Sequence, residues 1–217
     1  MRTFGFPEFL FILQAAQWTL ALSLMAFVGG SLLGLVVALS RTSESRVARF
    51  ASTAFIQVFQ GTPLLLQLLL IFFGAPVFGL DINPWVAAGA ALVLNSAAFL
   101  GEIWRGCIEA IPRGQWEAAQ ALNLNYFSRM RCVVLPQAFK IALPPTVGYV
   151  VQIIKGTSLA AIIGFTEITR AGQIINNATF QPLHVFSTVA ALYFIICWPL
   201  SLLAAHMERK RARVLAR

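Results

Sequence analysis

The chain has 217 residues, 59% of which are apolar, while Lys and Arg number 16 and Asp and Glu only 8. Soluble domains carry about a quarter charged residues, which help to cover their surface. A charged fraction of 11% does not provide that cover, so the composition excludes a water-soluble enzyme or nucleic-acid-binding domain and indicates a polytopic membrane protein. The net charge of +8 does not indicate nucleic acid, because the basic residues cluster between and after the apolar runs.

Charge-free runs predict five transmembrane helices in one all-α domain, 1–217. The first run, Phe9 to Ser40, is too long for the apolar core of a cleavable signal. In the fourth, Pro144 and Pro145 are expected in the first helical turn, where proline is tolerated. The predicted spans are about 14–39, 50–73, 85–103, 141–163 and 183–206.

The basic residues also predict the orientation of these helices. The amino-terminal flank contributes only Arg2, whereas the following loop contains Arg41, Arg46 and Arg49. Because cytoplasmic loops are enriched in Lys and Arg, we expect the amino terminus outside and the carboxyl terminus inside. The basic stretch within 105–140 and the basic tail after His206 then also lie on the cytoplasmic face.

Residue types that support chemistry are scarce. Cys107, Cys132 and Cys197 are scattered and odd in number, and only two histidines are present, so neither a disulfide framework nor a metal site is expected. The sequence contains no Walker A signature. We therefore expect a chain with no catalytic residues that does not bind ATP itself.

The segment 105–140 departs from the apolar pattern, because it is polar, basic and amphipathic. Pro112 and Gly114 are expected to end the preceding helix, and apolar residues recur near helical spacing from Gln115. This pattern predicts a short helix parallel to the membrane, with one face against the bundle and one face free. A helix that only lies among the lipid headgroups explains the periodicity equally well.

Within this segment the chain reads Glu117-Ala118-Ala119, then Asn123, then VVLP at 133–136. This series resembles the EAA loop of ABC importer permeases. Further matches to the polar amino-acid uptake branch follow in order along the chain. They are 61–64 (GTPL), 94–98 (LNSAA) with Glu102 and Ile103, 111–116 (IPRGQW), 135–138 (LPQA), 155–159 (KGTSL) and 169–173 (TRAGQ). Their order and spacing, over about residues 15–206, make the resemblance specific.

The resemblance implies a permease subunit of the bacterial cytoplasmic (inner) membrane, whose EAA loop is a coupling helix docked on a cytoplasmic ABC ATPase subunit. ATP and magnesium would be bound by that ATPase, and no cofactor by this chain. The other implied partners are an extracytoplasmic solute-binding protein, a second copy or a homologous permease, and an amino-acid substrate. The residues expected to couple to the ATPase are Arg113, Gly114, Gln115, Trp116, Glu117, Ala118, Ala119, Ala121, Leu122, Asn123 and Leu124.

Two positions depart from the family pattern. Asn123 stands where the family usually has Gly, and Asn is the next most tolerant residue of a left-handed turn, so we expect the turn to persist. Gln60 stands before Gly-Thr-Pro where many relatives have Arg, which removes a cation from the contacts of the second span.

Polar residues in or beside the apolar spans are candidates for a solute path, because burying them in a membrane is costly. An amino-acid zwitterion needs an anionic and a cationic partner, which Lys155, Glu167 and Arg170 would supply, although Glu167 and Arg170 would most simply pair with each other. Asn95 fits equally a hydrogen bond between helices. The candidate set is Asn95, Lys155, Thr157, Ser158, Glu167 and Arg170.

A second class, a proton-coupled secondary amino-acid transporter, would use Glu102 or Glu167. Such transporters often contain inverted repeats, and five spans do not divide into two matching halves. Glu102 is moreover expected to pair with Arg105 at i,i+3. An intramembrane enzyme is disfavoured, because two histidines without paired carboxylates make no catalytic set.

Overall fold

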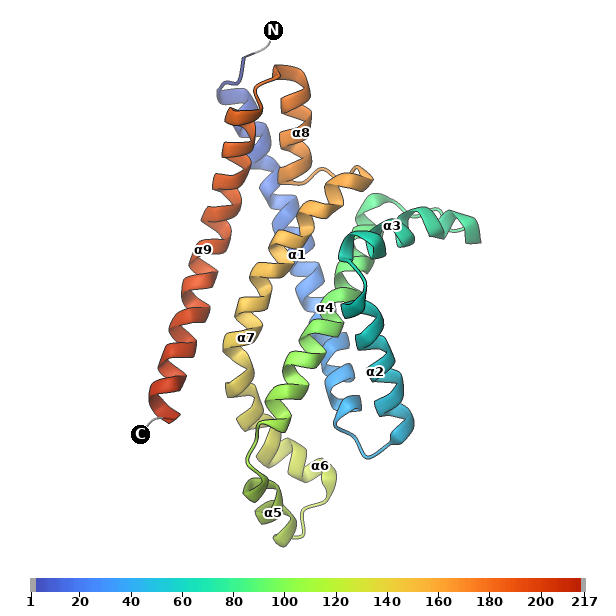
Figure 1. The fold of residues 1–217 in the computed structure, drawn as a ribbon, viewed down its shortest axis with the longest axis vertical. Helices are drawn as coiled ribbons and strands as arrows, with labels where there is room; N and C mark the ends of the chain where they lie inside the picture. Colours follow the sequence, from blue (N-terminus) through green and yellow to red (C-terminus); the bar gives the residue numbers. More distant parts are fainter. Residues whose placement is uncertain (1–2, 216–217) are drawn as a thin grey trace.

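The protein is all-helical over residues 3–215, the part that the computed structural model describes, with side chains described to Arg211 (Figure 1). Arg2 and Arg217, which enter the charge count above, lie outside the described residues. In chain order the elements are α1 (Phe6–Arg41), α2 (Arg46–Gly61), α3 (Leu64–Gly74), the 3-10 helix η1 (Ala75–Phe78), α4 (Pro84–Glu109), α5 (Arg113–Ala121), α6 (Tyr126–Arg129), the π-helical turn η2 (Met130–Val134), α7 (Leu135–Gly156), the 3-10 helix η3 (Thr157–Ile163), α8 (Ile168–Thr179) and α9 (Pro182–Leu215).

Within the described residues, four helical stretches are long and apolar enough to cross a membrane, and the bent pair α2–α3 makes a fifth if it is one span. α1, α4 and α9 all run from the end of the bundle that carries α8 towards the end that carries α5 (Figure 1). α1 and α9 extend beyond the predicted 14–39 and 183–206 at both ends, and α4 continues past the predicted 85–103 to Glu109.

The predicted second span, 50–73, is wrong as one continuous helix, because α2 and α3 meet at an angle of 100°. Thr62 between them is extended, with φ −115° and ψ 141°, since a residue before proline avoids the helical region. Pro63 also lacks the N–H that would continue the helical hydrogen bonds. α3 therefore projects sideways from the bundle (Figure 1).

α1 and α4 pack closely through small residues. A Cβ on Gly30 would lie 2.5 Å from Ser96 Cβ, and one on Gly34 would lie 3.1 Å from the carbonyl oxygen of Ala97. A Cβ on Gly101 of α4 would in turn meet Val37 Cγ1 at 2.7 Å. Helices in membranes associate by such close backbone approach.

The segment from Tyr126 to Ile163 is one helical stretch of 38 residues that comprises α6, η2, α7 and η3. The fourth helix therefore begins well before the predicted residue 141, and only about 110–125 of the predicted 105–140 segment lies outside the long helices. Pro144 and Pro145 lie inside α7 and not in its first turn, which corrects the expectation for them.

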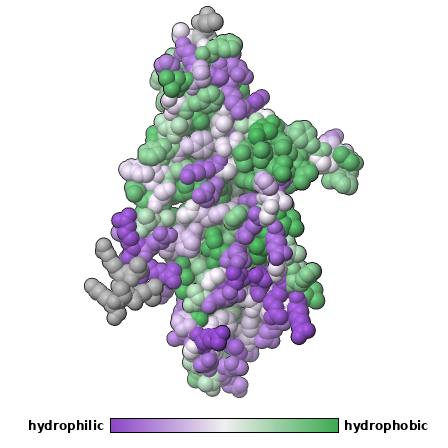
Figure 2. Space-filling view, in the orientation of Figure 1, coloured by the Kyte–Doolittle hydropathy of each residue, from purple (hydrophilic) through white to green (hydrophobic). Residues whose placement is uncertain are grey.

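Apolar side chains remain exposed on the outer faces of α1, α3 and α9, as expected of a protein that borders lipid or other subunits. On the projecting α3–η1 arm, Leu70 is 72% exposed and Phe78 83% exposed. Figure 2 shows hydrophobic colour over this arm, whereas hydrophilic residues gather towards the end that carries α5. The two ends of the bundle therefore differ in surface chemistry from its middle.

Candidate functional site

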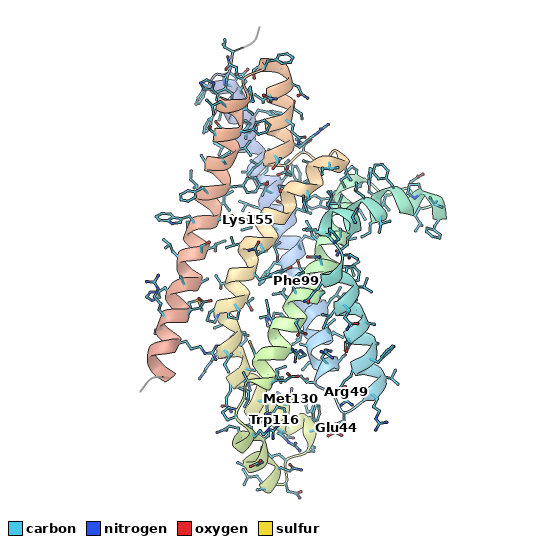
Figure 3. The ribbon with its side chains drawn as sticks, viewed as in Figure 1. Glu44, Arg49, Phe99, Trp116, Met130 and Lys155 are labelled. Atoms are coloured by element: carbon cyan, nitrogen blue, oxygen red, sulfur yellow. The ribbon has the colours of Figure 1, made fainter. Side chains whose placement is uncertain are left out.

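α5 is anchored to the bundle by one of its faces. Trp116 and the buried Ala119 point inward, and Trp116 packs on a cluster that includes Ile108, Met130 and Val134. Figure 3 shows Trp116 and Met130 close together at this end of the molecule. The segment is therefore a short helix fixed against the ends of α4 and α7, as the amphipathic pattern predicts.

The end of α5 is a tight turn centred on Asn123. Asn123 has φ 55°, which confirms the expectation that Asn replaces Gly in a left-handed conformation. Its backbone N–H donates to the Gln120 carbonyl at 2.9 Å, and the N–H of Leu124 donates to the Ala119 carbonyl at 3.2 Å. These bonds pair carbonyls that the end of a helix leaves free.

The outward face of α5 is open. Glu117 and Ala118 are exposed, and so are two large apolar side chains that follow in the sequence: Leu122, at the end of α5, is 75% exposed, and Phe127 of α6 is 69% exposed. α5 and α6 both lie at the hydrophilic end of the molecule, so contact with lipid tails does not account for these exposed side chains. Exposed apolar residues rimmed by polar ones are typical of protein–protein contacts.

The segment of α5 and α6 is connected to three long helices, to two of them by hydrogen bonds and to α4 through the chain itself. Gln137 of α7 donates to the Gln115 side-chain oxygen at 3.3 Å, and Tyr126 donates to the Thr42 carbonyl at the end of α1 at 3.3 Å. α4 leads directly into the loop before α5. α5 and the adjoining α6 are therefore in direct connection with α1, α4 and α7.

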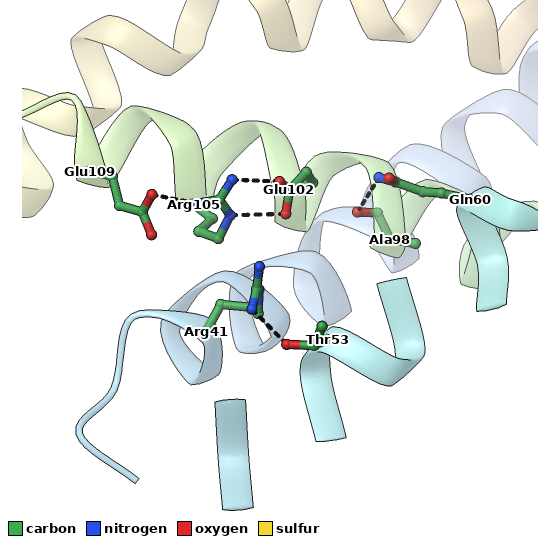
Figure 4. Close-up of polar contacts among 7 residues, drawn as sticks. All are labelled: Arg41, Thr53, Gln60, Ala98, Glu102, Arg105 and Glu109. Atoms are coloured by element: carbon green, nitrogen blue, oxygen red, sulfur yellow. Dashed lines mark hydrogen bonds and ion pairs between the residues drawn. The ribbon is translucent and has the colours of Figure 1, made fainter. Parts of the chain in front are cut away.

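A charged network lies on α4 just before this segment (Figure 4). Arg105 Nε donates to Glu102 at 2.9 Å, which confirms the predicted i,i+3 pair, and Arg105 also pairs with Glu109. Arg41 of α1 bonds to Thr53 of α2 nearby, and Gln60, the residue that replaces Arg, donates to the Ala98 carbonyl at 3.3 Å. Glu102 is thus occupied by a cation, which does not suit a proton carrier.

Asn95 belongs to a buried polar cluster at the α2–α3 bend. Its side-chain N–H donates to the Phe59 carbonyl and to Gln67 Oε1, each at 3.2 Å, and its oxygen accepts from Tyr149 at 3.4 Å. Gln67 donates to the Phe59 and Thr62 carbonyls at 2.8 and 3.0 Å. The cluster thus pairs carbonyls at the break, where irregular backbone inside a membrane needs partners. Of the two readings of Asn95, the geometry favours the bond between helices.

Glu167 is fully buried, and its two oxygens are occupied. One accepts from the backbone N–H of Arg170 at 2.9 Å, and the other accepts from Tyr193 at 2.7 Å. The guanidinium of Arg170 bonds instead to Gln173 at 3.2 Å, so the expected side-chain pair between Glu167 and Arg170 does not form. Glu167 lies outside the long candidate membrane helices, and burial raises the pKa of its carboxyl.

The remaining candidates for the solute path lie near the junction of α7 and η3. Lys155 is exposed, and Figure 3 places it on α7 on the side towards α9. Thr157 is buried and donates to the Ile154 carbonyl, and Ser158 donates to the Lys155 carbonyl, each at 2.7 Å. The structure therefore does not bring Lys155 and Glu167 into one open site, because Glu167 is enclosed.

Sequence reasoning missed several polar residues that organise these sites. Gln67 is signalled by its place inside the apolar run 64–73, and Tyr193 by its hydroxyl within a span, but their partners are distant in sequence. No group of three or more metal-ligating side chains occurs in the described residues.

The fold defines a polytopic, all-helical membrane protein with a short exposed helix at one end. A profile described as "Binding-protein-dependent transport system inner membrane component" matches residues 30–213. The chain belongs to this family.

Relatives of known role cover almost the whole chain. It is 36% identical over 206 residues to the glutamine transport system permease protein GlnP of Escherichia coli (strain K12), with 94% of each chain covered. It is also 36% identical to the L-cystine transport system permease protein TcyB of Bacillus subtilis (strain 168), over 92% of this chain and 86% of the relative.

A solved structure shares the fold closely. The crystal structure of an amino acid ABC transporter with histidines has a TM-score of 0.88 and 34% identity, and covers 96% of this chain and all of its own. The methionine ABC transporter MetNI, in inward-facing conformations, matches with a TM-score of 0.80 at 19% identity, which shows the fold alone.

Proposed function

We propose that the chain is the transmembrane permease subunit of an ATP-driven importer of polar amino acids, and that α5 is the helix through which an ABC ATPase drives it. The observation that carries this proposal is the open face of α5 at the hydrophilic end of the molecule, with Leu122 exposed at its end and Phe127 exposed on the adjoining α6. The amino-acid substrate is supported by relatives named for glutamine and L-cystine transport. The buried Glu167 and the paired Glu102 give a proton-coupled mechanism no support.

Force would enter at α5 and travel along the helical stretch from Tyr126 to Ile163. Trp116 and Ala119 fix α5 against this stretch, so a push on the exposed face moves both together. The far end of the same stretch carries Lys155 and η3. A closing partner could thus shift the candidate solute path as a rigid element, without any chemistry by this chain.

The remaining assignments complete the assembly. We place α5 and the carboxyl terminus in the cytoplasm and the amino terminus outside, in a bacterial inner membrane, because the basic residues then lie on the cytoplasmic side. ATP and magnesium are bound by the ATPase, a solute-binding protein delivers the amino acid, and a second permease copy or a homologue closes the pathway. Lys155 is the cationic candidate for the substrate carboxylate, since it is exposed where Glu167 is not.

The docking role of α5 is tested by Leu122→Ala, with Leu183→Ala as control. The two leucines are 75% and 78% exposed, at opposite ends of the bundle. Truncating an apolar residue at the centre of an interface typically weakens binding about tenfold, so Leu122→Ala should reduce co-purification of the ATPase subunit and ATP-driven uptake in proteoliposomes. Equal effects of the two variants, or none at Leu122, would refute the docking role.

A further inference from the structure

The proline pair inside α7 leaves a gap in the hydrogen bonds of that helix. In an α-helix each N–H donates to the carbonyl four residues earlier. Pro144 and Pro145 have no N–H, so the carbonyls of Lys140 and Ile141 lose their usual partners. An interior proline also weakens the helix against bending. This weak point lies between the coupling segment and the candidate solute path.

A side chain from the end of α9 fills part of this gap. Arg211 Nη1 donates to the Ile141 carbonyl oxygen at 3.3 Å, across 70 residues of sequence. Ile141 is the residue whose carbonyl would otherwise accept from position 145. A guanidinium is suited to this task, because it remains charged and directs several donors from a long side chain.

α7 is braced on both sides of the prolines. Beyond them, Val151 and Ile154 pack against Cys197 of α9 in a buried cluster. Next to them, Trp104 of α4 donates to Thr146 at 2.9 Å. Arg211 contributes the brace before the prolines, on the side of α5, where the helix receives any displacement of the coupling segment.

We propose that Arg211 is a positioning residue that stiffens α7 across Pro144–Pro145, so that a displacement of α5 reaches η3 and is not absorbed by bending at the prolines. This inference rests on the proposed function of α5. The neighbouring Arg209 and Lys210 are exposed and share the positive charge of the tail, but the bond to α7 belongs to Arg211. Loss of Arg211 should therefore uncouple ATP hydrolysis from transport and leave assembly intact.

The experiment compares Arg211→Ala with Lys210→Ala in the complete transporter, reconstituted with its ATPase and solute-binding protein. The measured quantity is the amount of solute accumulated per ATP hydrolysed. Hydrogen bonds from charged donors typically shift local equilibria by about tenfold or more. Because the other braces remain, we expect that ratio to fall by about fivefold in Arg211→Ala and to be unchanged in Lys210→Ala.

Replacing Pro145 distinguishes the effect of the hydrogen bond from Arg211 to Ile141 from the effect of the positive charge of Arg211. In Pro145→Ala the new backbone N–H can donate to the Ile141 carbonyl within α7, which makes the bond from Arg211 dispensable. The double variant Arg211→Ala/Pro145→Ala should therefore recover the ratio of the Pro145→Ala single variant, and Arg211→Lys should recover it in part. Failure of this rescue, or an equal loss in Lys210→Ala, would overturn the proposal in favour of a general effect of the basic tail.

Hydrogen exchange provides a readout that does not depend on transport. Backbone amides at 146–148 should exchange faster in Arg211→Ala than in Lys210→Ala, and the double variant should reverse the difference. Unchanged exchange would refute the brace, and altered exchange with an unchanged transport ratio would refute the positioning role. If the unaltered protein showed no ATP-driven uptake, the proposed function would fail, while the exchange comparison would still decide whether the brace exists.

Discussion

The close packing of α1 on α4 predicts that Gly30→Ala destabilises the bundle. The added Cβ would lie 2.5 Å from Ser96 Cβ and 3.3 Å from the Ala97 backbone nitrogen, and neither atom is the end of a flexible side chain that can swing away. Overpacking of this kind typically costs about 1–3 kcal/mol. The better helix propensity of Ala returns up to about 1 kcal/mol, so we expect a net loss of about 1–2 kcal/mol.

Gly106→Ala is the matched control, because Gly106 lies on α4 itself, is exposed, and has nothing within 4 Å of an added Cβ. It should be neutral or slightly stabilising. The measurement is the thermal unfolding midpoint of the purified transporter in detergent, where 1 kcal/mol corresponds to about 2–4 °C for a chain of this size. A lower midpoint only for Gly30→Ala supports the close contact, and equal midpoints for both variants would refute it.

Substitutions at three further positions test the sites. Asn123→Gly should leave stability within about 0.5 kcal/mol while Asn123→Ala loses about 1 kcal/mol, measured as unfolding midpoints, because φ is positive there. Glu167→Gln keeps a side-chain oxygen as an acceptor and should unfold near the unaltered protein. Glu167→Ala should lose about 1–2 kcal/mol, because it removes both the cap of α8 and the partner of Tyr193; equal losses in the two variants would contradict this account. Lys155→Ala should reduce uptake at least about tenfold with the ATPase still bound, and unchanged uptake would remove Lys155 from the solute path.

Much of the architecture follows from the sequence, because hydrocarbon excludes charge. Charge-free runs locate the long helices, but the ends of these runs do not locate the ends of the helices. Arg105 and Glu109 continue α4, because charges are tolerated once a helix leaves the membrane and can pair along its surface. For the same reason the charge-free run does not predict where the fourth helix begins, because the polar residues from Tyr126 onward already belong to the long helical stretch.

The interruptions of helices are harder to foresee. Gly61-Thr62-Pro63 signals a break, but the 100° turn also involves hydrogen bonds from Gln67 and from Asn95, and Asn95 is distant from the turn in sequence. Pro144 and Pro145 suggest the start of a helix only if the carbonyls four residues before them are assumed to find no other hydrogen-bond donor. A donor from the far end of the chain, Arg211, makes the interior position tolerable.

The candidate site residues also divide into those that local sequence predicts and those that depend on distant partners. Asn123 could be predicted because its conformation depends on its own backbone, and Glu102 because its partner is three residues away. The grouping of Lys155, Glu167 and Arg170 required a three-dimensional arrangement that their spacing does not encode. Instead, Glu167 caps α8 by accepting from a backbone N–H, and it accepts a second hydrogen bond from the Tyr193 hydroxyl of α9.

The direction of the helices has a consequence for the bilayer itself. α1 and α4 run the same way, so the chain must return across the membrane between them, and only the bent pair α2–α3 is available for that return (Figure 1). α2 has 16 residues and reaches about 24 Å, short of the ~30 Å of hydrocarbon. In the orientation proposed above, the apolar arm of α3 then extends sideways into the outer hydrocarbon layer, and a crossing this short is expected to favour local thinning of the lipid around this side of the protein.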